Sequence, residues 1–503
     1  MLARKSALIV SIHIANALLG YIALLFITRF MEPSEYGLVA FALGFVTIFT
    51  IFGSLGFNQA HIKRISEGKD LGTCNGTFIA IKSSLICLMI IITLATIFIW
   101  RVIIGRGFES STHEIAIYIM IVYWAIKLFA DTFVFTFNAK KEIAKAQIPS
   151  FLMTLTRVAV TMYIAIGGFG SLALAFSYVL GEVIHLVTVL FLFRGYPVKK
   201  PSKEFFKDYS KFAFPLIIVV ASTLIMTNID KVFIQLFWSA SDVGYYFASY
   251  NLSKFVDMFT LAIGILLFPT YSALHSKNNI EGIRKLTYRS ERYLSMIVFP
   301  MVFGLVVLAE PATFLLLSGW MPAVPILQIL PFYALFDALS RPYGSQVVGM
   351  NRPDIARNRV VIMVIANVLL NLILIPNDIR VIGLNLFGLG ARGAAIATII
   401  SYSIGLIYNR AAALKLTGVK GNPRVLLHLF AAAIMAISLY FINTIFIINR
   451  WFLLLGISFI GLGIYLTVLY FLNEFDKKDL NFFLDTLNIK KMFNYIRDEL
   501  RFK

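Results

Sequence analysis

The sequence predicts an all-α polytopic membrane protein of about 14 transmembrane helices, in which two six-helix bundles surround a central cavity and two extra helices follow. The first observation is composition, because 59% of the 503 residues are hydrophobic and only 14% are charged. The second is that the apolar residues form long blocks, as in "FIAIKSSLICLMIIITLATIFIW" at 78–100. The third is a motif at 26–37 that returns at 233–244. Soluble domains do not combine these features.

The apolar blocks define the expected spans, since about 20 apolar residues cross a bilayer as a helix. Span eleven is the shortest and ends at Pro376. The fourteen spans lie near 8–28, 38–57, 78–100, 115–137, 148–168, 171–193, 212–237, 243–270, 293–317, 323–349, 360–376, 392–412, 425–448 and 451–472.

The distribution of basic residues predicts the orientation of the chain. An even number of spans puts both termini on one face. On that assignment 33 of the 45 Lys and Arg residues lie on the face of the termini, six on the opposite face and six inside spans. Basic residues gather on the cytoplasmic side, so we expect a multi-pass protein of the cell membrane with both termini cytoplasmic. The net charge of +19 comes from basic residues at the membrane surface, and it indicates no nucleic-acid partner.

The repeated motif indicates an internal duplication. "FITRFMEPSEYG" at 26–37 and "FIQLFWSASDVG" at 233–244 share five identities, among them Gly37 with Gly244, and Glu35 is matched by Asp242. Both copies follow the first span of a six-span half, so the halves run parallel, as in transporters with a cavity between two bundles. The expected parts are an N-terminal lobe at 1–193, a cytoplasmic linker at 194–211, a C-terminal lobe at 212–415, two additional helices at 425–473 and a cytoplasmic amphipathic tail at 474–503.

Motifs for catalysis and metal binding are absent from the sequence. Two cysteines, Cys74 and Cys87, form no disulfide framework and no metal-ligand cluster. No G-x-x-x-x-G-K-[ST] motif is present to bind ATP, and the loops expected outside carry only scattered acids. We therefore expect no catalytic residue, no metal, no cofactor and no enzyme activity.

Ionisable residues inside the spans are the candidate functional groups, because each is costly in hydrocarbon unless it faces protein or water. Span four carries Lys127 and Asp131, and span ten carries Asp337 and Arg341. Matching spans of the two halves therefore hold oppositely charged pairs one helical turn apart.

Spans seven and eight carry a second set of polar groups. Asp230 and Lys231 are adjacent on span seven, and Asn251, Lys254 and Asp257 recur every three residues on span eight, which predicts one polar stripe. Lys231 is expected in the outer third of the membrane and Lys254 near the middle. Arg341, on span ten, is expected nearer the cytoplasm, so the three cations would form a ladder across the membrane.

Arg157 and Glu182 lie at similar depth on the two arms of one hairpin, and we expect them to pair.

Other polar residues of the spans are expected to have structural roles. Lys82 lies near a span end, where its side chain is expected to reach the water at the membrane surface. The alternative for all these intramembrane charges is a set of structural ion pairs that holds helices together. Asn367 and Asn371 on span eleven are read chiefly as helix–helix contacts.

The chain resembles a known family at the repeated turns. "FMEPSEYGLVAFA" after the first span and "FWSASDVGYYFASYNLSKF" after the seventh are similar to the polysaccharide-transporter branch of the multidrug/oligosaccharidyl-lipid/polysaccharide flippase superfamily, which includes the O-antigen flippases. The resemblance covers spans one to twelve. It implies a two-lobed fold with a central cavity, and movement of a polyprenyl-linked oligosaccharide between leaflets. Spans thirteen and fourteen exceed the twelve usual for O-antigen flippases and are similar to the lipid II flippase branch.

The expected function is therefore a flippase that moves a polyprenyl-(pyro)phosphate-linked oligosaccharide to the outer leaflet by alternating access. Phosphate is matched by charged donors. The candidate substrate-binding residues are Lys231, Lys254, Arg341, Arg157, Lys127 and Asn251. The candidate ion-coupling residues are Asp257, Asp337, Asp230, Glu182 and Asp131.

Energy would come from the membrane potential or from an H⁺ or Na⁺ gradient, since no ATP site is present. Expected partners are the lipid-linked oligosaccharide, membrane lipids and, as candidates, a glycan polymerase or glycosyltransferases. Two alternatives stay open: a multidrug or organic-cation antiporter of the same superfamily, and a non-transporting membrane scaffold for glycan assembly.

Overall fold

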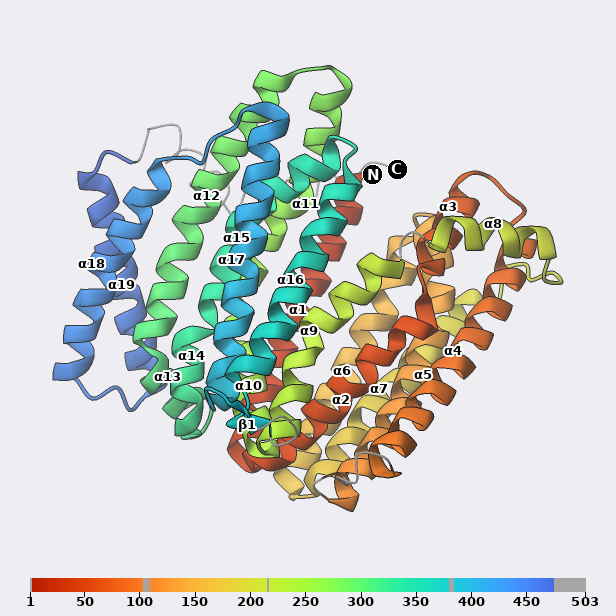
Figure 1. Ribbon diagram of the computed structural model, residues 1–503, viewed down its shortest axis with the longest axis horizontal. Coiled ribbons are helices and arrows are strands. Elements are labelled where there is room, and N and C mark those ends of the chain that lie inside the picture. The colour runs from red at the N-terminus through yellow and green to blue at the C-terminus, as the bar shows by residue number, and fades with distance from the viewer. Residues whose placement is uncertain (1, 103–107, 109, 215–216, 380–383, 475–503) are drawn as a thin grey trace. The chain divides into compact units, whose positions relative to one another are not determined.

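The protein is almost entirely helical (Figure 1), and the predicted all-α membrane fold is confirmed. The computed structural model describes residues 2–102, 108, 110–214, 217–379 and 384–474, and the side chains of all of these except 2–10, 258, 259, 261–266, 379 and 384. The predicted amphipathic tail, apart from Glu474, lies outside the described residues.

Thirteen helices in the described ranges are long and apolar enough to cross a membrane. They correspond to the predicted spans with one exception. The stretch predicted as the eighth span is divided at Lys254 into α10 (Ala240–Ser253) and α11 (Phe255–Ser276). Lys254 keeps helical dihedrals, but the Asp257 amide bonds to its carbonyl three residues back, which interrupts the α-helical pattern.

The chain forms two compact units. Unit 2 contains residues 12–249 and 357–401, and unit 1 contains residues 1–11, 250–356 and 402–503. This division follows packing and not the duplication, so the predicted lobes at 1–193 and 212–415 remain a prediction.

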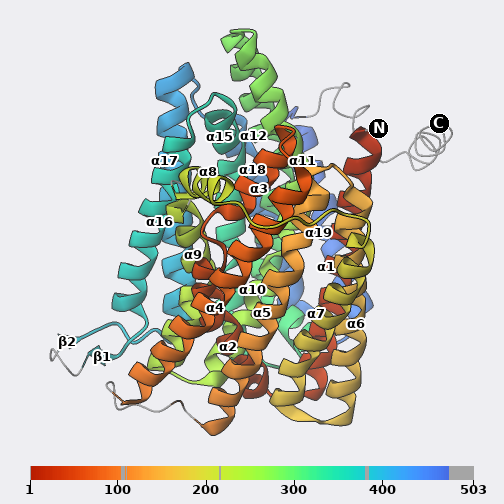
Figure 2. The ribbon, with the colours of Figure 1, turned by 90° about the vertical axis from the view of Figure 1, so that its right-hand side faces the viewer.

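Unit 2 is built mainly from the N-terminal helices. Its elements are α1 (Leu2–Phe30) from residue 12 on, α2 (Pro33–Ser54), α3 (Phe57–Ser66), α4 (Leu71–Val102), α5 (Ser111–Ala139), α6 (Ile143–Gly167), α7 (Gly170–Phe193), α8 (Lys203–Ala213), α9 (Ile217–Phe237), α10 to residue 249, α16 (Pro353–Leu374) from residue 357, β1 (Asp378–Ile379), β2 (Leu384–Asn385) and α17 (Gly390–Thr417) to residue 401. The two strands pair antiparallel as a short hairpin (Figure 2).

Unit 1 takes the remaining parts of α1, α10, α16 and α17 together with the C-terminal helices. In it α11 packs on α15, and α12 packs on both α15 and α18, while α18 and α19 lie side by side (Figure 1). Its own elements are α11, α12 (Ile280–Val307), α13 (Ala309–Leu316), η2 (Met321–Ala323), α14 (Val324–Ile329), α15 (Pro331–Gly349), α18 (Arg424–Ile445) and α19 (Trp451–Phe471).

The two copies of the repeated motif start helices in the same way. Glu35 accepts a hydrogen bond from the Glu32 amide at 3.0 Å, which caps the start of α2. In the second copy Asp242 accepts from the Ser239 hydroxyl at 2.6 Å at the start of α10. The matched acid therefore serves the first turn of each helix, where free amides and the helix dipole favour a carboxylate.

The matched glycines let the two copies pack on each other within unit 2. A Cβ added at Gly37 would lie 1.7 Å from the Ala240 carbonyl oxygen, and one added at Gly244 would lie 2.1 Å from the Pro33 carbonyl oxygen. Only glycine permits so close a backbone approach. The duplicated turn is thus a helix start joined to a helix–helix contact.

Two short amphipathic helices, α3 and α8, pack against each other at one end of unit 2 (Figures 1 and 2). Phe57 and Tyr209 bury their rings there against Phe78 of α4. Helix α8 lies inside the segment predicted as a linker, and neither short helix was predicted from the sequence.

Candidate functional site

The first candidate site lies in unit 1 and centres on Arg341 of α15. Its guanidinium Nη2 donates to Asp257 Oδ1 of α11 at 2.8 Å and lies 3.0 Å from Asp337 Oδ2 on its own helix. The pair of Asp337 and Arg341 predicted from their spacing is formed. The three side chains are 16–27% exposed, so the charges are mostly withdrawn from solvent without being sealed off. Two carboxylates on one guanidinium leave this group with one negative charge.

Aromatic rings and Lys254 surround this group. The Tyr333 hydroxyl donates to Asp257 Oδ2 at 3.4 Å, and the Tyr333 ring lies 5.3 Å from the rings of both Tyr250 and Tyr402. Lys254 is exposed, at the break between α10 and α11, and its ammonium lies 4.5 Å above the Tyr250 ring. With Lys254 the group is electrically balanced, and one of its cations is accessible.

Asp230 of α9 is the second candidate site and lies in unit 2. The side chain is 5% exposed and accepts hydrogen bonds from Tyr246 Oη at 2.5 Å, Asn371 Nδ2 at 2.6 Å and Thr398 Oγ1 at 2.8 Å. Asn371 also donates to Asn367 at 3.1 Å. Four helices therefore meet at one buried carboxylate, and these three hydrogen-bond partners of Asp230 are all neutral hydroxyl or amide groups.

Lys231, next to Asp230, is also buried in unit 2. Its ammonium donates to Asn228 Oδ1 at 2.8 Å and lies 4.8 Å above the Phe247 ring. A Cβ added at Gly44 of α2 would lie 3.0 Å from Lys231 Cε, so this glycine makes room for the lysine stem. The adjacent Asp230 and Lys231 have separate hydrogen-bond partners.

A third ionic group in unit 2 links α5 and α7. Lys127 Nζ lies 3.7 Å from Asp131 Oδ2 and 3.5 Å from Glu182 Oε1, and the other Glu182 oxygen lies 2.9 Å from His185 Nδ1. The predicted pair of Lys127 with Asp131 is formed.

The predicted pair of Arg157 with Glu182 is wrong. Glu182 is fully buried against Lys127 and His185, while Arg157 stacks over the Tyr178 ring at 5.0 Å. Equal depth on a hairpin did not bring the two side chains together, because Glu182 faces the neighbouring helix α5. Gly181 packs closely on the Arg157 stem, since a Cβ added at Gly181 would lie 3.1 Å from the Arg157 Cβ.

Lys82 was expected to snorkel to water, and this expectation is wrong. Its side chain is 0% exposed, and its ammonium donates to the Gly53 carbonyl oxygen at 2.5 Å. That carbonyl is at the C-terminal end of α2, where a cation is favoured by the helix dipole.

The polar stripe predicted from Asn251, Lys254 and Asp257 is not continuous on one helix. Asn251 is half-buried near the end of α10, and the break at Lys254 separates it from Asp257 on α11.

Sequence reasoning read Asn367 and Asn371 as helix–helix contacts and gave no role to Thr398 and Tyr246. Their one sequence signal was polarity within apolar spans. The structure brings all four to Asp230 or its immediate neighbour.

Comparison with known proteins agrees with this architecture. The family described as polysaccharide biosynthesis protein matches residues 26–325, which is more than half of the chain. The chain is 25% identical over 413 residues to the probable low-salt glycan biosynthesis flippase Agl15 of Haloferax volcanii, covering 81% of this chain and 82% of the relative. It is 23% identical to the succinoglycan biosynthesis transport protein ExoT of Rhizobium meliloti over 62% of each chain.

Two solved structures share the fold. The lipid II flippase MurJ in an inward closed conformation superposes with a TM-score of 0.75 at 15% identity, covering 92% of this chain and 99% of MurJ. An inward-facing multidrug resistance transporter superposes with a TM-score of 0.64 at 15% identity, covering 81% of this chain and 96% of its own. The chain therefore belongs to the polysaccharide biosynthesis protein family, in the polysaccharide branch of the multidrug/oligosaccharidyl-lipid/polysaccharide flippase superfamily.

Proposed function

We propose that this protein is a flippase that carries a polyprenyl-(pyro)phosphate-linked oligosaccharide from the cytoplasmic to the outer leaflet by alternating access. The relatives support this proposal, because one is named as a glycan biosynthesis flippase and another as a polysaccharide transport protein. The cargo has an anionic phosphate, a polar sugar and a lipid tail. A protein that carries it needs cations and sugar-binding groups inside an otherwise apolar chain.

The group around Arg341 is the observation that carries the proposal. A guanidinium binds phosphate through paired N–H donors as it binds carboxylate, so a phosphate can replace the Asp257 carboxylate on Arg341. Lys254 is the accessible cation beside it and is suited to meet the phosphate first. The rings of Tyr250, Tyr333 and Tyr402 add flat faces and hydroxyls of the kind that bind sugars.

We assign the coupling ion to Asp230. A buried carboxylate is costly unless its charge is compensated, and a proton or a sodium ion would compensate it. Among the described residues, the buried atoms Asn371 Oδ1 and Asn367 Nδ2 have no hydrogen-bond partner. Turning the Asn371 amide over would direct its oxygen at Asp230, where, with Thr398 and Tyr246, it completes an oxygen-rich set suited to a hard cation. Each charge that crosses the membrane supplies about 2.3 kcal/mol per 100 mV.

Substitutions at Lys254 test the binding role. Lys254→Arg keeps a cation and is expected to retain much of the flipping activity, whereas Lys254→Ala is expected to reduce it roughly tenfold to a hundredfold, the range for a lost charged hydrogen bond. Flipping is measured in proteoliposomes as accessibility of a fluorescent lipid-linked oligosaccharide to a sugar-modifying reagent. Lys277→Ala, which removes an exposed lysine from the end of α11, is the matched control and should flip normally.

The opposing explanation makes Lys254 a structural counter-charge for Asp257. In that case the double variant Lys254→Ala with Asp257→Ala should recover activity, because both charges are removed together. Recovery would contradict the binding role. Export of organic-cation dyes in place of lipid-linked cargo would favour the antiporter alternative.

Asp230→Asn tests the coupling role. Asn keeps the size of the side chain and its ability to form hydrogen bonds, but it has no negative charge to bind a proton or a metal cation. Flipping should therefore lose its dependence on an imposed H⁺ or Na⁺ gradient, while cargo binding is retained. Ser401→Ala is the control, since this buried hydroxyl donates to the Ala397 carbonyl oxygen of its own helix. Equal gradient dependence in parent and Asp230→Asn would assign this carboxylate to helix packing.

A further inference from the structure

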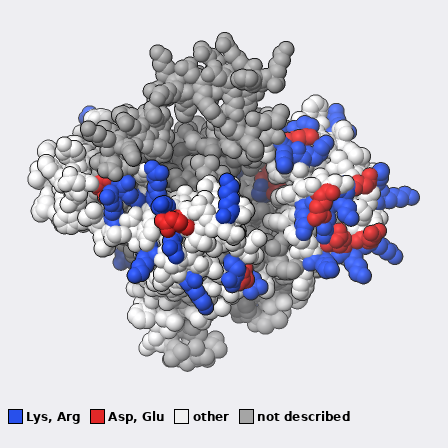
Figure 3. Space-filling view, turned by 90° about the horizontal axis from the view of Figure 1, so that it is seen from above, with Lys and Arg blue, Asp and Glu red and all other residues white. Residues whose placement is uncertain are grey.

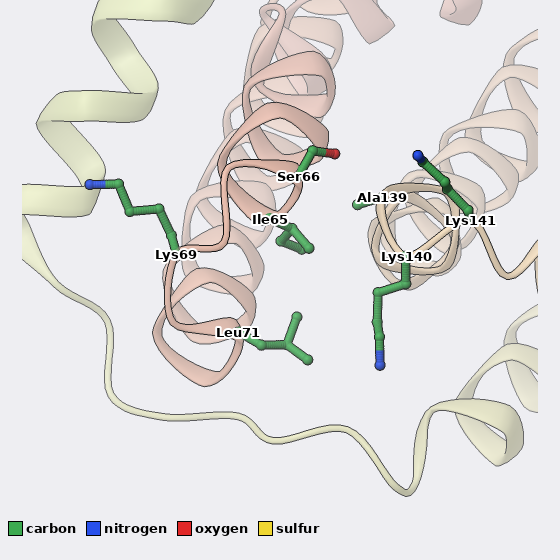
Figure 4. A pocket seen from close by; sticks show the side chains of 7 residues that line it. All are labelled: Ile65, Ser66, Lys69, Leu71, Ala139, Lys140 and Lys141. Carbon is green, nitrogen blue, oxygen red and sulfur yellow. The ribbon is translucent and has the colours of Figure 1, made fainter.

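A pocket of about 380 Å³ opens at one end of unit 2, outside the groups described above. It lies between the turn that joins α3 to α4 and the C-terminal end of α5 (Figure 4). Ile65 and Leu71 point into it from the α3–α4 side, and Lys140 and Lys141 extend from the end of α5 on the other side (Figure 4). Lys69 lies at the α3–α4 turn with its ammonium directed outward. The pocket thus combines an apolar wall with an edge of lysines.

The pocket lies at the ends of two membrane-length helices, where the boundary between membrane and water is expected. Leu71 is the first residue of one membrane-length helix and Ala139 is the last residue of another. Lys and Arg side chains, with Asp and Glu among them, gather at this end of unit 2, on the right of Figure 3. The distribution of basic residues along the sequence predicts that this end of unit 2 is cytoplasmic.

The local charge is positive beyond what neighbouring acids offset. Segments 63–70 and 140–145 contain six basic residues and three acids. These acids pair partly outside and partly inside the two segments: Asp70 lies 2.9 Å from Lys199, Glu67 lies 2.7 Å from Arg64, and Glu142 lies 3.0 Å from Lys145. Hydrogen bonds from Thr73 and then Lys199 hold the pKa of Asp70 well below its usual range. Among the acids of these two segments, Glu142 also lies 3.4 Å from Lys140.

Lys141 occupies a backbone position that suits glycine or asparagine. Its φ is 59°, in the left-handed region, where its amide bonds to the Asn138 carbonyl and the next amide bonds to the Phe137 carbonyl. This is the usual helix-ending turn, and a lysine there is unfavourable.

The matching turn in the second half of the duplication has the preferred residue. At the end of α15 Asn351 has φ 61°, and the Arg352 amide bonds to the Val347 carbonyl in the same pattern. The two turns are alike in backbone, but only the first carries a lysine at the strained position. Such strain is retained where the side chain has a function.

We propose that this pocket binds the phosphate headgroup of a lipid in the cytoplasmic leaflet. Lysines at a membrane surface attract anionic headgroups, and basic pockets at helix ends bind them specifically. Lys140 and Lys141 would contact the phosphate, and Ile65 and Leu71 would face the glycerol and the start of the acyl chains. A soluble phosphate has no use for that apolar wall. The site is independent of the proposed flipping activity.

The test uses the full-length purified protein and measures its melting temperature, with lipid retention followed by native mass spectrometry. The probes are phosphatidylglycerol, phosphatidylcholine, phosphatidylcholine containing polyprenyl phosphate, and inorganic phosphate in solution. Phosphatidylglycerol should raise the melting temperature and be retained more than phosphatidylcholine. Lys140→Gln with Lys141→Asn should weaken that retention by about fivefold for each lysine removed.

The substitutions are chosen to leave the fold intact. Asn is the residue that the duplicated turn already carries, so Lys141→Asn alone should melt no lower than the parent without lipid. Lys207→Asn with Lys277→Asn removes the same charge from exposed positions outside the pocket and should retain lipid as the parent does.

Lysine-dependent retention of phosphatidylglycerol, or of polyprenyl phosphate, supports the site and identifies which lipid occupies it. Equal loss in the control pair would show general surface attraction and overturn the proposal. A lysine-dependent effect of inorganic phosphate as large as that of either lipid would overturn its assignment to a lipid.

Discussion

His61, on α3 outside the candidate spans, is a buried residue whose hydrogen bonds define its protonation. Thr136 donates its hydroxyl to Asn75 Oδ1 at 3.1 Å, so it can only accept from His61 Nε2 at 2.9 Å. Tyr209 then donates to His61 Nδ1 at 2.9 Å. This relay needs a neutral imidazole, and burial lowers the pKa of His61 to about 3. One histidine therefore joins α3, α4, α5 and α8.

The neutral His61 predicts a pH-dependent stability. Unfolding restores an ordinary pKa near 6.5, so below that pH the unfolded chain takes up a proton that the folded chain refuses. The free energy of unfolding should therefore fall as the pH drops from about 6.5 towards 3, by about 2 kcal/mol between pH 6.5 and pH 5. His61→Gln has no imidazole to take up a proton on unfolding. The difference in free energy of unfolding between parent and variant, measured by thermal unfolding, should therefore become smaller at low pH. A gap that is constant from pH 5 to pH 7.5 would contradict a neutral buried imidazole.

At the scale of elements, the crossing of α2 and α10 at Gly37 and Gly244 makes a sharp prediction. A methyl group at either position would overlap a backbone carbonyl, and backbone cannot move aside as a flexible side chain does. Gly37→Ala and Gly244→Ala should each lower the melting temperature and the yield of folded protein. Gly20→Ala and Gly456→Ala are the matched controls, since nothing lies within 4 Å of an added Cβ at either position. They should be neutral or stabilising by up to about 1 kcal/mol. Unchanged melting of both Gly37→Ala and Gly244→Ala would contradict the close crossing.

The elements that could be predicted from sequence are those with a strong local signal. Long apolar blocks predicted the membrane-length helices, and i,i+4 spacing predicted the pairs Lys127 with Asp131 and Asp337 with Arg341. The division of the eighth span at Lys254 has no such signal, because neither glycine nor proline stands there.

Partners on different helices were beyond the sequence for a physical reason. Which face of a helix meets which neighbour is decided by packing of the whole unit, so Glu182 was assigned to Arg157 when it contacts Lys127. The same limit hid the convergence of Asn371 and Thr398 on Asp230. The short helices α3 and α8 were missed because their few apolar residues, such as Phe57 and Tyr209, are set among many polar ones.

At the scale of the whole molecule, the two C-terminal helices α18 and α19 are part of the packed fold. The fold follows that of the lipid II flippase over 92% of this chain, and the two C-terminal helices α18 and α19 are part of unit 1. They are held there by polar contacts: Ser295 of α12 lies 2.7 Å from His428 Nδ1 on α18, and Arg292 pairs with Glu474 just after α19. These two helices are therefore integral to the packing of unit 1.

The direction of transport depends on orientation, which labelling of single cysteines measures. Cys74 and Cys87 are first replaced by Ala, and Asn449→Cys or Lys207→Cys is then introduced at an exposed position in the α18–α19 turn or on α8. Because basic residues gather near α8 and scarcely at the α18–α19 turn, a membrane-impermeant maleimide should label Asn449→Cys on intact cells. It should label Lys207→Cys only after permeabilisation. The reverse labelling pattern would contradict the predicted orientation and would put the lysine pocket on the outer face. In the predicted orientation the membrane potential drives an anionic cargo from the α8 side to the side of the α18–α19 turn, and in the reverse orientation it would oppose that movement.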